Sequence, residues 1–296
     1  MVAAMFGRGT AMALRGWAAA VAAALLAALP AAAAPAMWRV SDADSQVFLF
    51  GTLHALRPGV AWRTPLYDAA MARAGTVWFE ADMTSGDAET IRLLVRRYGS
   101  DPDRPLSRKL APSDLAVLAR ETDIARIDHL RPWAAALMLS VRPAPGRGAS
   151  VEAGADMTAT RTARDTGKRV RTFETLEDQA RMYASLPEAS EVRYLTGVMR
   201  QRRKPALPPP LGPASLEKAW LAGDIQRLNA GLEAENPALY DALVRRRNNA
   251  WAETLGAEIA GTSGIEVVNV GALHLIGPEG LPALLKARGF KVERVQ

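Results

Sequence analysis

The chain has 296 residues, of which 49% are hydrophobic and 23% are charged, with 37 Lys and Arg against 31 Asp and Glu. This composition excludes a disordered, collagen-like or low-complexity chain, and the mild basic excess argues against a nucleic acid partner. The chain has no cysteine, which excludes disulfides, thiolate metal sites and cysteine nucleophiles. Any histidine chemistry must use His54, His129 or His274, the only three in the sequence.

The first 34 residues have the pattern of an export signal. A positive start precedes an apolar stretch and a small-residue cleavage site: Arg8 and Arg15, then Ala18 to Leu29, then Ala32 to Ala34. The apolar stretch is shorter than the about 20 residues of a comfortable membrane span. We therefore expect a signal peptide over residues 1–34 and one exported, periplasmic domain over 35–296, with no stable membrane span after signal removal. An uncleaved membrane anchor is the alternative.

Beyond this segment, short apolar runs alternate with stretches of helical spacing. Buried strands are expected over residues 45–50, 76–80, 169–173, 265–270 and 291–295. Helices are expected over residues 64–74, 156–166, 176–202 with an interruption near Pro187, 215–221, 237–260 and from 281, and residues 87–140 have a helical pattern throughout. Residues 204–213 contain five prolines and should form an extended connector. This order favours an α/β fold, a central mixed β-sheet flanked by helices, with a large helical insertion.

Two segments near opposite ends of the chain have similar sequences. Residues 47–58 and 267–278 share five identical residues at the same offset, and each contains Gly-x-x-His directly after an expected strand. Open α/β sheets place their sites at the carboxyl ends of strands. Two such strands side by side would make the two motifs, and so His54 and His274, meet at one site. The alternative for each is an ordinary core or loop histidine, and His129 lacks the pattern.

Two glutamates follow expected strands. Glu80 ends the apolar strand over 76–80, and together with His54 and His274 it would supply two nitrogen ligands and one carboxylate. That set suits zinc, manganese, cobalt or iron and leaves positions open for water. Alternatively, Glu80 acts on water as a general base without a metal. Glu174 is a further candidate, although a carboxylate there is also explained by a following helix N-terminus.

A cation interrupts the apolar stripe of the helix expected over 237–260. Arg247 lies at helical spacing among the apolar residues of that stripe: Tyr240, Val244, Trp251 and Leu255. A guanidinium on an apolar face needs an anionic partner. Arg247 is therefore expected to pair with Glu80 or Glu174, or to hold a substrate carboxylate or oxyanion.

The chain resembles the TraB/GumN family, which is related to the Tiki metalloproteases and more distantly to erythromycin esterases and haem-binding ChaN-like proteins. The resemblance runs from about Trp38 to Val295. It rests on segments in matching order: Gly51 to His54, the Glu80 strand, Arg131 to Trp133, Lys168 to Gln179, Arg247 to Trp251, and Val270 to Leu281. It implies that both Gly-x-x-His histidines and the first glutamate form the active centre, with an arginine assisting.

The sequence thus predicts an exported metal-dependent hydrolase of the peptidase type, acting on a peptide or small molecule. The expected metal ligands are His54, Glu80 and His274, and the ion is manganese, cobalt or zinc. The expected catalytic residues are Glu80, Arg247 and Glu174, with metal-bound water attacking a carbonyl and Arg247 stabilising the oxyanion. Two alternatives are a non-enzymatic periplasmic protein that captures haem or metal, and a metal-free esterase-like hydrolase.

Overall fold

The computed structural model describes residues 34–82, 88–141, 148–203, 213–224, 226 and 231–296. The expected signal peptide and the proline-rich connector lie outside these ranges, except for Ala34 and Pro213. Residues 34–296 group into one unit. Among the described helices, none combines the length and apolar character that crossing a bilayer requires.

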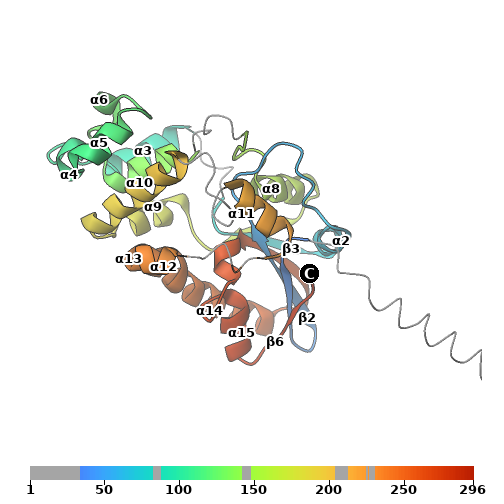
Figure 1. Ribbon diagram of the computed structural model, residues 1–296. Coiled ribbons are helices and arrows are strands. Elements are labelled where there is room, and N and C mark those ends of the chain that lie inside the picture. Colours follow the sequence, from blue (N-terminus) through green and yellow to red (C-terminus); the bar gives the residue numbers. More distant parts are fainter. Residues whose placement is uncertain (1–33, 83–87, 142–147, 204–212, 225, 227–230) are drawn as a thin grey trace, which may run out of the picture. The chain divides into compact units, whose positions relative to one another are not determined.

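A mixed sheet runs through this unit (Figure 1). Its six strands have the order β4-β3-β5-β2-β1-β6. The strands are β1 (Met37–Ser41), β2 (Ser45–Thr52), β3 (Thr76–Phe79), β4 (Arg169–Thr172), β5 (Gly264–Gly271) and β6 (Lys291–Arg294). β4, β3, β5 and β2 are parallel neighbours, whereas β1 is antiparallel to β2 and β6. The expected α/β fold is confirmed. The sequence did not predict β1, a five-residue strand that carries a charged residue, Arg39, paired with Glu293 of β6.

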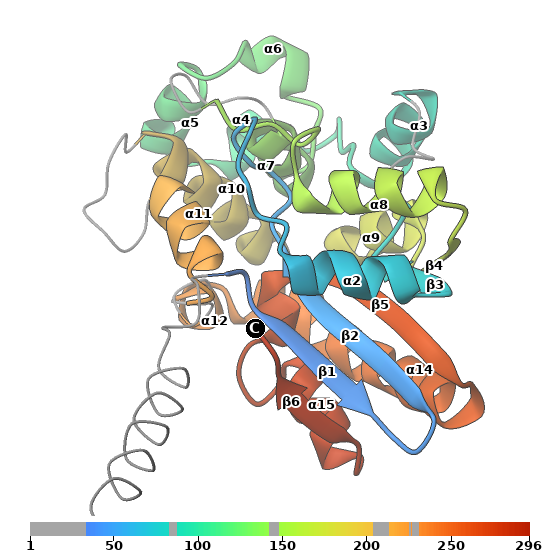
Figure 2. The ribbon, with the colours of Figure 1, turned by 90° about the vertical axis from the view of Figure 1, so that its right-hand side faces the viewer.

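Helices cover both faces of the sheet (Figure 2). On one face, α2 (Pro65–Arg73) and α8 (Ala155–Asp165) pack small and aromatic residues against Phe50 and Val267. On the other face, α14 (Arg246–Gly261) and α15 (Leu281–Ala287) pack against Leu49 and Val268. The strands alternate between these two cores because successive side chains point to opposite faces.

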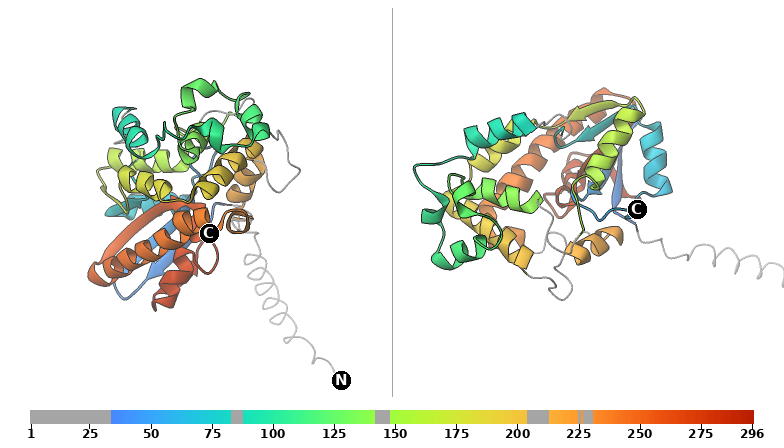
Figure 3. Two further views of the ribbon diagram at one scale, coloured as in Figure 1. Left: turned by 90° about the vertical axis from the view of Figure 1, so that its left-hand side faces the viewer. Right: turned by 90° about the horizontal axis from the view of Figure 1, so that it is seen from above.

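The helical insertion has its own core. It comprises α3 (Ala88–Tyr98), α4 (Leu106–Lys109), α5 (Pro112–Leu118), α6 (Ile124–Ile127), α7 (Pro132–Val141), α9 (Leu176–Ala184) and α10 (Glu188–Arg203). Buried residues such as Leu118, Leu139 and Leu195 join these helices in one apolar cluster. Figure 3 shows the group gathered to one side of the sheet. The break between α9 and α10 falls at Pro187, as expected from the sequence.

The helix expected over 237–260 begins as predicted but is not uniform. Asn236 caps it by accepting the Leu239 N–H, and Pro237 is its first residue. The segment then runs through α13 (Pro237–Tyr240), a π-helical turn η2 (Asp241–Arg245) and α14. Such π-turns change the register of a helix and are frequent at functional sites. Here the turn ends at Arg245, two residues before Arg247. Two short helices, α11 (Pro213–Leu221) and α12 (Leu232–Glu235), precede this segment.

Candidate active site

Three neighbouring parallel strands end beside one another and carry the predicted ligands. Glu80 directly follows β3, His54 follows β2, and His274 lies in the 3-10 turn η3 (Ala272–Leu275) after β5. A Cβ atom on Gly271 would lie 3.1 Å from Glu80 Oε1 and 3.4 Å from His54 Nε2. The structure therefore brings the three side chains together around Gly271, where a side chain would crowd them.

Arg247 lies inside this group and uses every hydrogen that its guanidinium carries. Nε and Nη2 donate to the two Glu174 oxygens at 2.7 and 3.0 Å, and Nη2 also donates to Glu80 Oε2 at 2.6 Å. Nη1 lies 3.1 Å from the Leu243 carbonyl oxygen and 3.2 Å from His274 Nε2. A guanidinium has five N–H donors, and these are five contacts. Arg247 was expected to pair with Glu80 or Glu174, and in the structure it binds both. An oxyanion could bind Arg247 only if one of these contacts broke.

Asn248 fixes the protonation of His274. Its Nδ2 donates to the carbonyl oxygens of His274 and Glu279 at 3.2 and 2.6 Å, so its Oδ1 is the acceptor facing His274 Nδ1 at 2.6 Å. His274 Nδ1 therefore carries the hydrogen and Nε2 the lone pair that Arg247 meets. Burial lowers the pKa of His274 to about 3, although Glu80 opposes this shift. The imidazole is neutral throughout the physiological range.

Glu80 is held as a carboxylate by donors on both oxygens. Oε1 accepts the Gly271 N–H at 2.7 Å, and Oε2 accepts the Arg247 bond. Burial alone would raise the pKa of Glu80, but Arg247 and the neighbouring His274 and His54 keep that pKa well below its usual range. A carboxylate with so low a pKa is a weak proton acceptor. Glu174, just after β4, serves as the bidentate partner of Arg247.

His54 has a different environment, because Asp156 in the first turn of α8 reaches it. Asp156 Oδ2 lies 2.8 Å from His54 Nδ1, and Asp156 Oδ1 accepts the Thr52 hydroxyl. The Asp156 carboxylate, with Glu80 as a smaller contributor, raises the pKa of His54 to about 9. The His54 side chain is 66% exposed, whereas that of Asp156 is 15% exposed. His54 is thus the accessible member of the group.

Asp156 is not among the site residues predicted from the sequence. Its only local signal is an acidic residue in the first turn of a helix, which the helix dipole explains equally well. The close approach of α8 to the His54 turn depends on Gly154, where a Cβ atom would lie 2.3 Å from the His54 carbonyl oxygen. That approach is a tertiary contact, which the local sequence pattern does not contain.

Comparison with known proteins places this chain in a family. The model of the TraB/PrgY/gumN family matches residues 36–294. The chain belongs to the TraB/PrgY/gumN family. It is also 29% identical over 209 residues to the uncharacterized protein YbaP of Escherichia coli (strain K12) and to that of Shigella flexneri, covering 66% of this chain and 76% of each relative. No solved structure matches.

The divalent metal predicted from His54, Glu80 and His274 does not fit the side chains as they are arranged. Within the described ranges, no three His, Asp or Glu side chains form a group that could hold a metal ion. The donor types are suitable, but Glu80 Oε2 and His274 Nε2 both face Arg247 instead of a common free point. The divalent metal therefore stays a prediction from the sequence.

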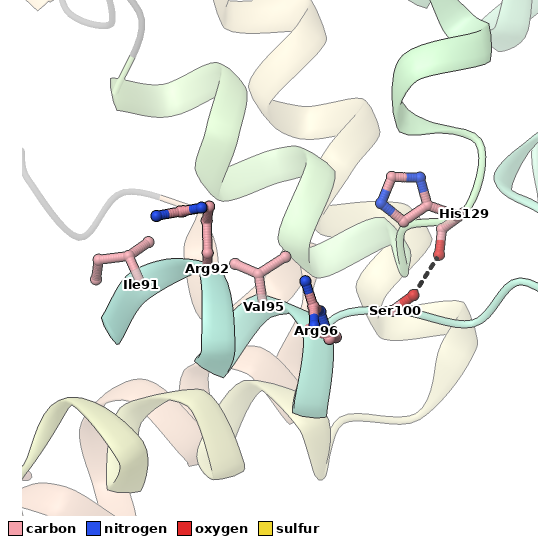
Figure 4. Close-up of a pocket in the computed structure, with 6 residues that line it drawn as sticks. All are labelled: Ile91, Arg92, Val95, Arg96, Ser100 and His129. Carbon is pink, nitrogen blue, oxygen red and sulfur yellow. Dashed lines mark hydrogen bonds between the residues drawn. The ribbon is translucent and has the colours of Figure 1, made fainter. Parts of the chain in front are cut away.

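The third histidine lies elsewhere in this TraB/PrgY/gumN chain. His129 lines a surface hollow of about 440 Å³ together with five residues of α3 and its following turn: Ile91, Arg92, Val95, Arg96 and Ser100 (Figure 4). The Ser100 hydroxyl donates to the His129 backbone carbonyl, so this bond does not engage the imidazole. None of the predicted site residues lines this hollow. His129 therefore provides a matched control for variants of the other two histidines.

Proposed function

We propose that this TraB/PrgY/gumN protein is an exported hydrolase in which His54 accepts a proton from water. The observation that carries the proposal is the 2.8 Å contact between His54 Nδ1 and Asp156 Oδ2 beside an exposed imidazole. A carboxylate on Nδ1 orients the ring and keeps a hydrogen on that nitrogen, so in neutral His54 the lone pair is on Nε2. The neighbouring carboxylate thus prepares His54 for general base catalysis.

The other titratable groups of the site are less suited to this role. Glu80 has a depressed pKa and donors on both oxygens. His274 is buried, and its Nε2 lone pair meets Arg247. These two residues and Arg247 instead form a buried, hydrogen-bonded group beside His54. Arg247 acts there as a positioning residue.

In the proposed reaction, His54 Nε2 removes a proton from water as the water oxygen bonds to the carbonyl carbon of an ester or amide. The bond from that carbon to the alcohol or amine then breaks, and protonated His54 returns the proton to the leaving group. No covalent bond to the protein forms. The pattern of residues 1–34 supports a periplasmic location, as expected from the sequence.

The test is turnover of ester and peptide substrates with and without a metal chelator. We expect His54→Ala to lower kcat about 10²–10⁴-fold, the usual contribution of a general base, and chelation to leave turnover unchanged. His129→Ala is the matched control and should keep wild-type activity.

Two results would favour the alternatives from the sequence. Loss of turnover on chelation, with recovery on adding manganese, cobalt or zinc, would establish the metal-dependent hydrolase. No turnover on any substrate, together with a haem absorbance band on titration with haem, would establish the binding protein. N-terminal sequencing of periplasmic protein tests export separately and should give a start near Pro35.

A further inference from the structure

The predicted ligand group already contains a cation. We infer that the Arg247 guanidinium occupies the cation position of the group formed by His54, Glu80 and His274. Substituting Arg247 would therefore convert the group into a divalent metal site. The inference concerns the same site as the proposed function, but its readout is metal content, so either can fail without the other.

Two of the three predicted ligands point their acceptor atoms at the guanidinium. Glu80 Oε2 lies 2.6 Å from Nη2, and His274 Nε2 lies 3.2 Å from Nη1. Those are the atoms that a divalent ion would need at about 2.0–2.2 Å. An ion at that distance from both atoms would lie next to the positively charged guanidinium and be repelled by it. The two cations therefore compete for one position.

The guanidinium is firmly held in that position. Glu174 binds it in bidentate fashion, and the Leu243 carbonyl oxygen accepts from Nη1. Its central carbon also lies 4.5 Å from the centre of the Trp251 ring, at cation–π distance. Displacing Arg247 would break all of these contacts at once, and its side chain is only 10% exposed.

The group would still offer metal ligands after Arg247 is removed. Asn248 keeps the hydrogen of His274 on Nδ1, which leaves the Nε2 lone pair directed into the site. Metal-bound histidines usually have such a partner on their second ring nitrogen. Asp156 provides the equivalent contact to His54 Nδ1. Both histidines thus have an oriented Nε2, and Glu80 has a carboxylate oxygen that Arg247→Ala would free.

The experiment is equilibrium dialysis of the full chain against Zn²⁺, Mn²⁺ or Co²⁺ separately, with metal content measured by mass spectrometry. We expect less than about a tenth of an equivalent on the wild type and about one equivalent on Arg247→Ala. Adding His274→Ala to that variant should remove the bound ion. Arg202→Ala is the matched control, because Arg202 is similarly buried, at 11% exposed, and pairs with Glu121, which is not a residue of the site. The Arg202→Ala variant should gain no metal.

Two results would overturn the inference. One is about one equivalent of metal on the wild type that His274→Ala abolishes. The other is a folded Arg247→Ala variant that binds no more metal than the wild type. If Arg247→Ala does not fold because two carboxylates lose their partner, Arg247→Ala with Glu174→Gln leaves only Glu80 charged and decides the question by the same criteria.

Discussion

The turns after β2 and β5 have the same Gly-x-x-His pattern but hold their histidines in opposite environments. His54 is 66% exposed and its Nδ1 faces the Asp156 carboxylate, whereas His274 is 5% exposed and its Nδ1 faces the Asn248 amide. The pKa of His54 is raised to about 9 by Asp156, and that of His274 is lowered to about 3 by burial. One imidazole is accessible from solvent, and the other is a buried neutral acceptor.

The difference comes from the helices on the two faces of the sheet. Asp156 belongs to α8 on one face, and Asn248 and Arg247 belong to α14 on the other. The strand and turn set where each histidine lies, while the covering helix sets its protonation. Substitutions in α8 and α14 should therefore change the two histidines separately.

The largest effect is expected for Arg247→Met, which removes the cation from the His274 side of the site. Glu80 and Glu174 would remain buried without their shared partner, and breaking a buried ion pair in this way costs about 3–5 kcal/mol. Urea denaturation measures the change in the free energy of unfolding. Arg200→Met is the control, because Arg200 and Glu235 form an exposed pair worth about 0–1 kcal/mol. Equal, small changes in the free energy of unfolding of both variants would show that the Arg247 ion pairs do not stabilise the fold.

The second effect concerns the His54 side. At pH 9 and above, where His54 is largely neutral in both proteins, Asp156→Asn should lower kcat about 100-fold or more, because the amide neither stabilises protonated His54 nor fixes the hydrogen on Nδ1. Steady-state kinetics on an ester or peptide substrate measures this loss. Asp165→Asn, at the exposed end of the same helix, should leave kcat unchanged. An active Asp156→Asn variant would exclude the His54–Asp156 pair from the reaction.

The pH dependence of the wild type follows from the same pair. Only neutral His54 can accept a proton, so kcat/KM should rise about tenfold per pH unit below the raised pKa and level off near pH 9. In Asp156→Asn the source of the upward shift is gone, and the plateau should begin nearer the ordinary value of 6.5. A wild-type profile that levels off at the same pH as that of the variant would show that Asp156 does not act on His54.

A smaller effect is expected for Asn248→Ala. The change leaves the His274 Nδ1–H and two backbone carbonyls without their partner, at a cost of about 1–3 kcal/mol in the free energy of unfolding. The neighbouring Asn249→Ala, which removes an exposed side chain, should change it by no more than about 0.5 kcal/mol. Thermal or urea denaturation of the two variants side by side makes the comparison. No difference between them would mean that Asn248 does not support His274.

The sequence could predict where the strand ends meet but not which helix residues reach them. His54, Glu80 and His274 follow apolar runs that end abruptly, so their shared edge follows from parallel pairing. Arg247 is visible as a charge in an apolar stripe. Asp156 reaches His54 only through a contact between residues 102 positions apart, and no local pattern encodes that packing.

The protonation of the two histidines is the most direct test of this account. Titration of the histidine ¹⁵N signals by NMR, with His129→Ala used to assign the third resonance, reports both the pKa and the nitrogen that carries the hydrogen. We expect His54 to titrate well above 6.5, toward 9, and His274 to stay neutral with its hydrogen on Nδ1 from pH 5 to pH 9. Two histidines that titrate together near 6.5, or a His274 that is protonated at pH 6, would contradict the account.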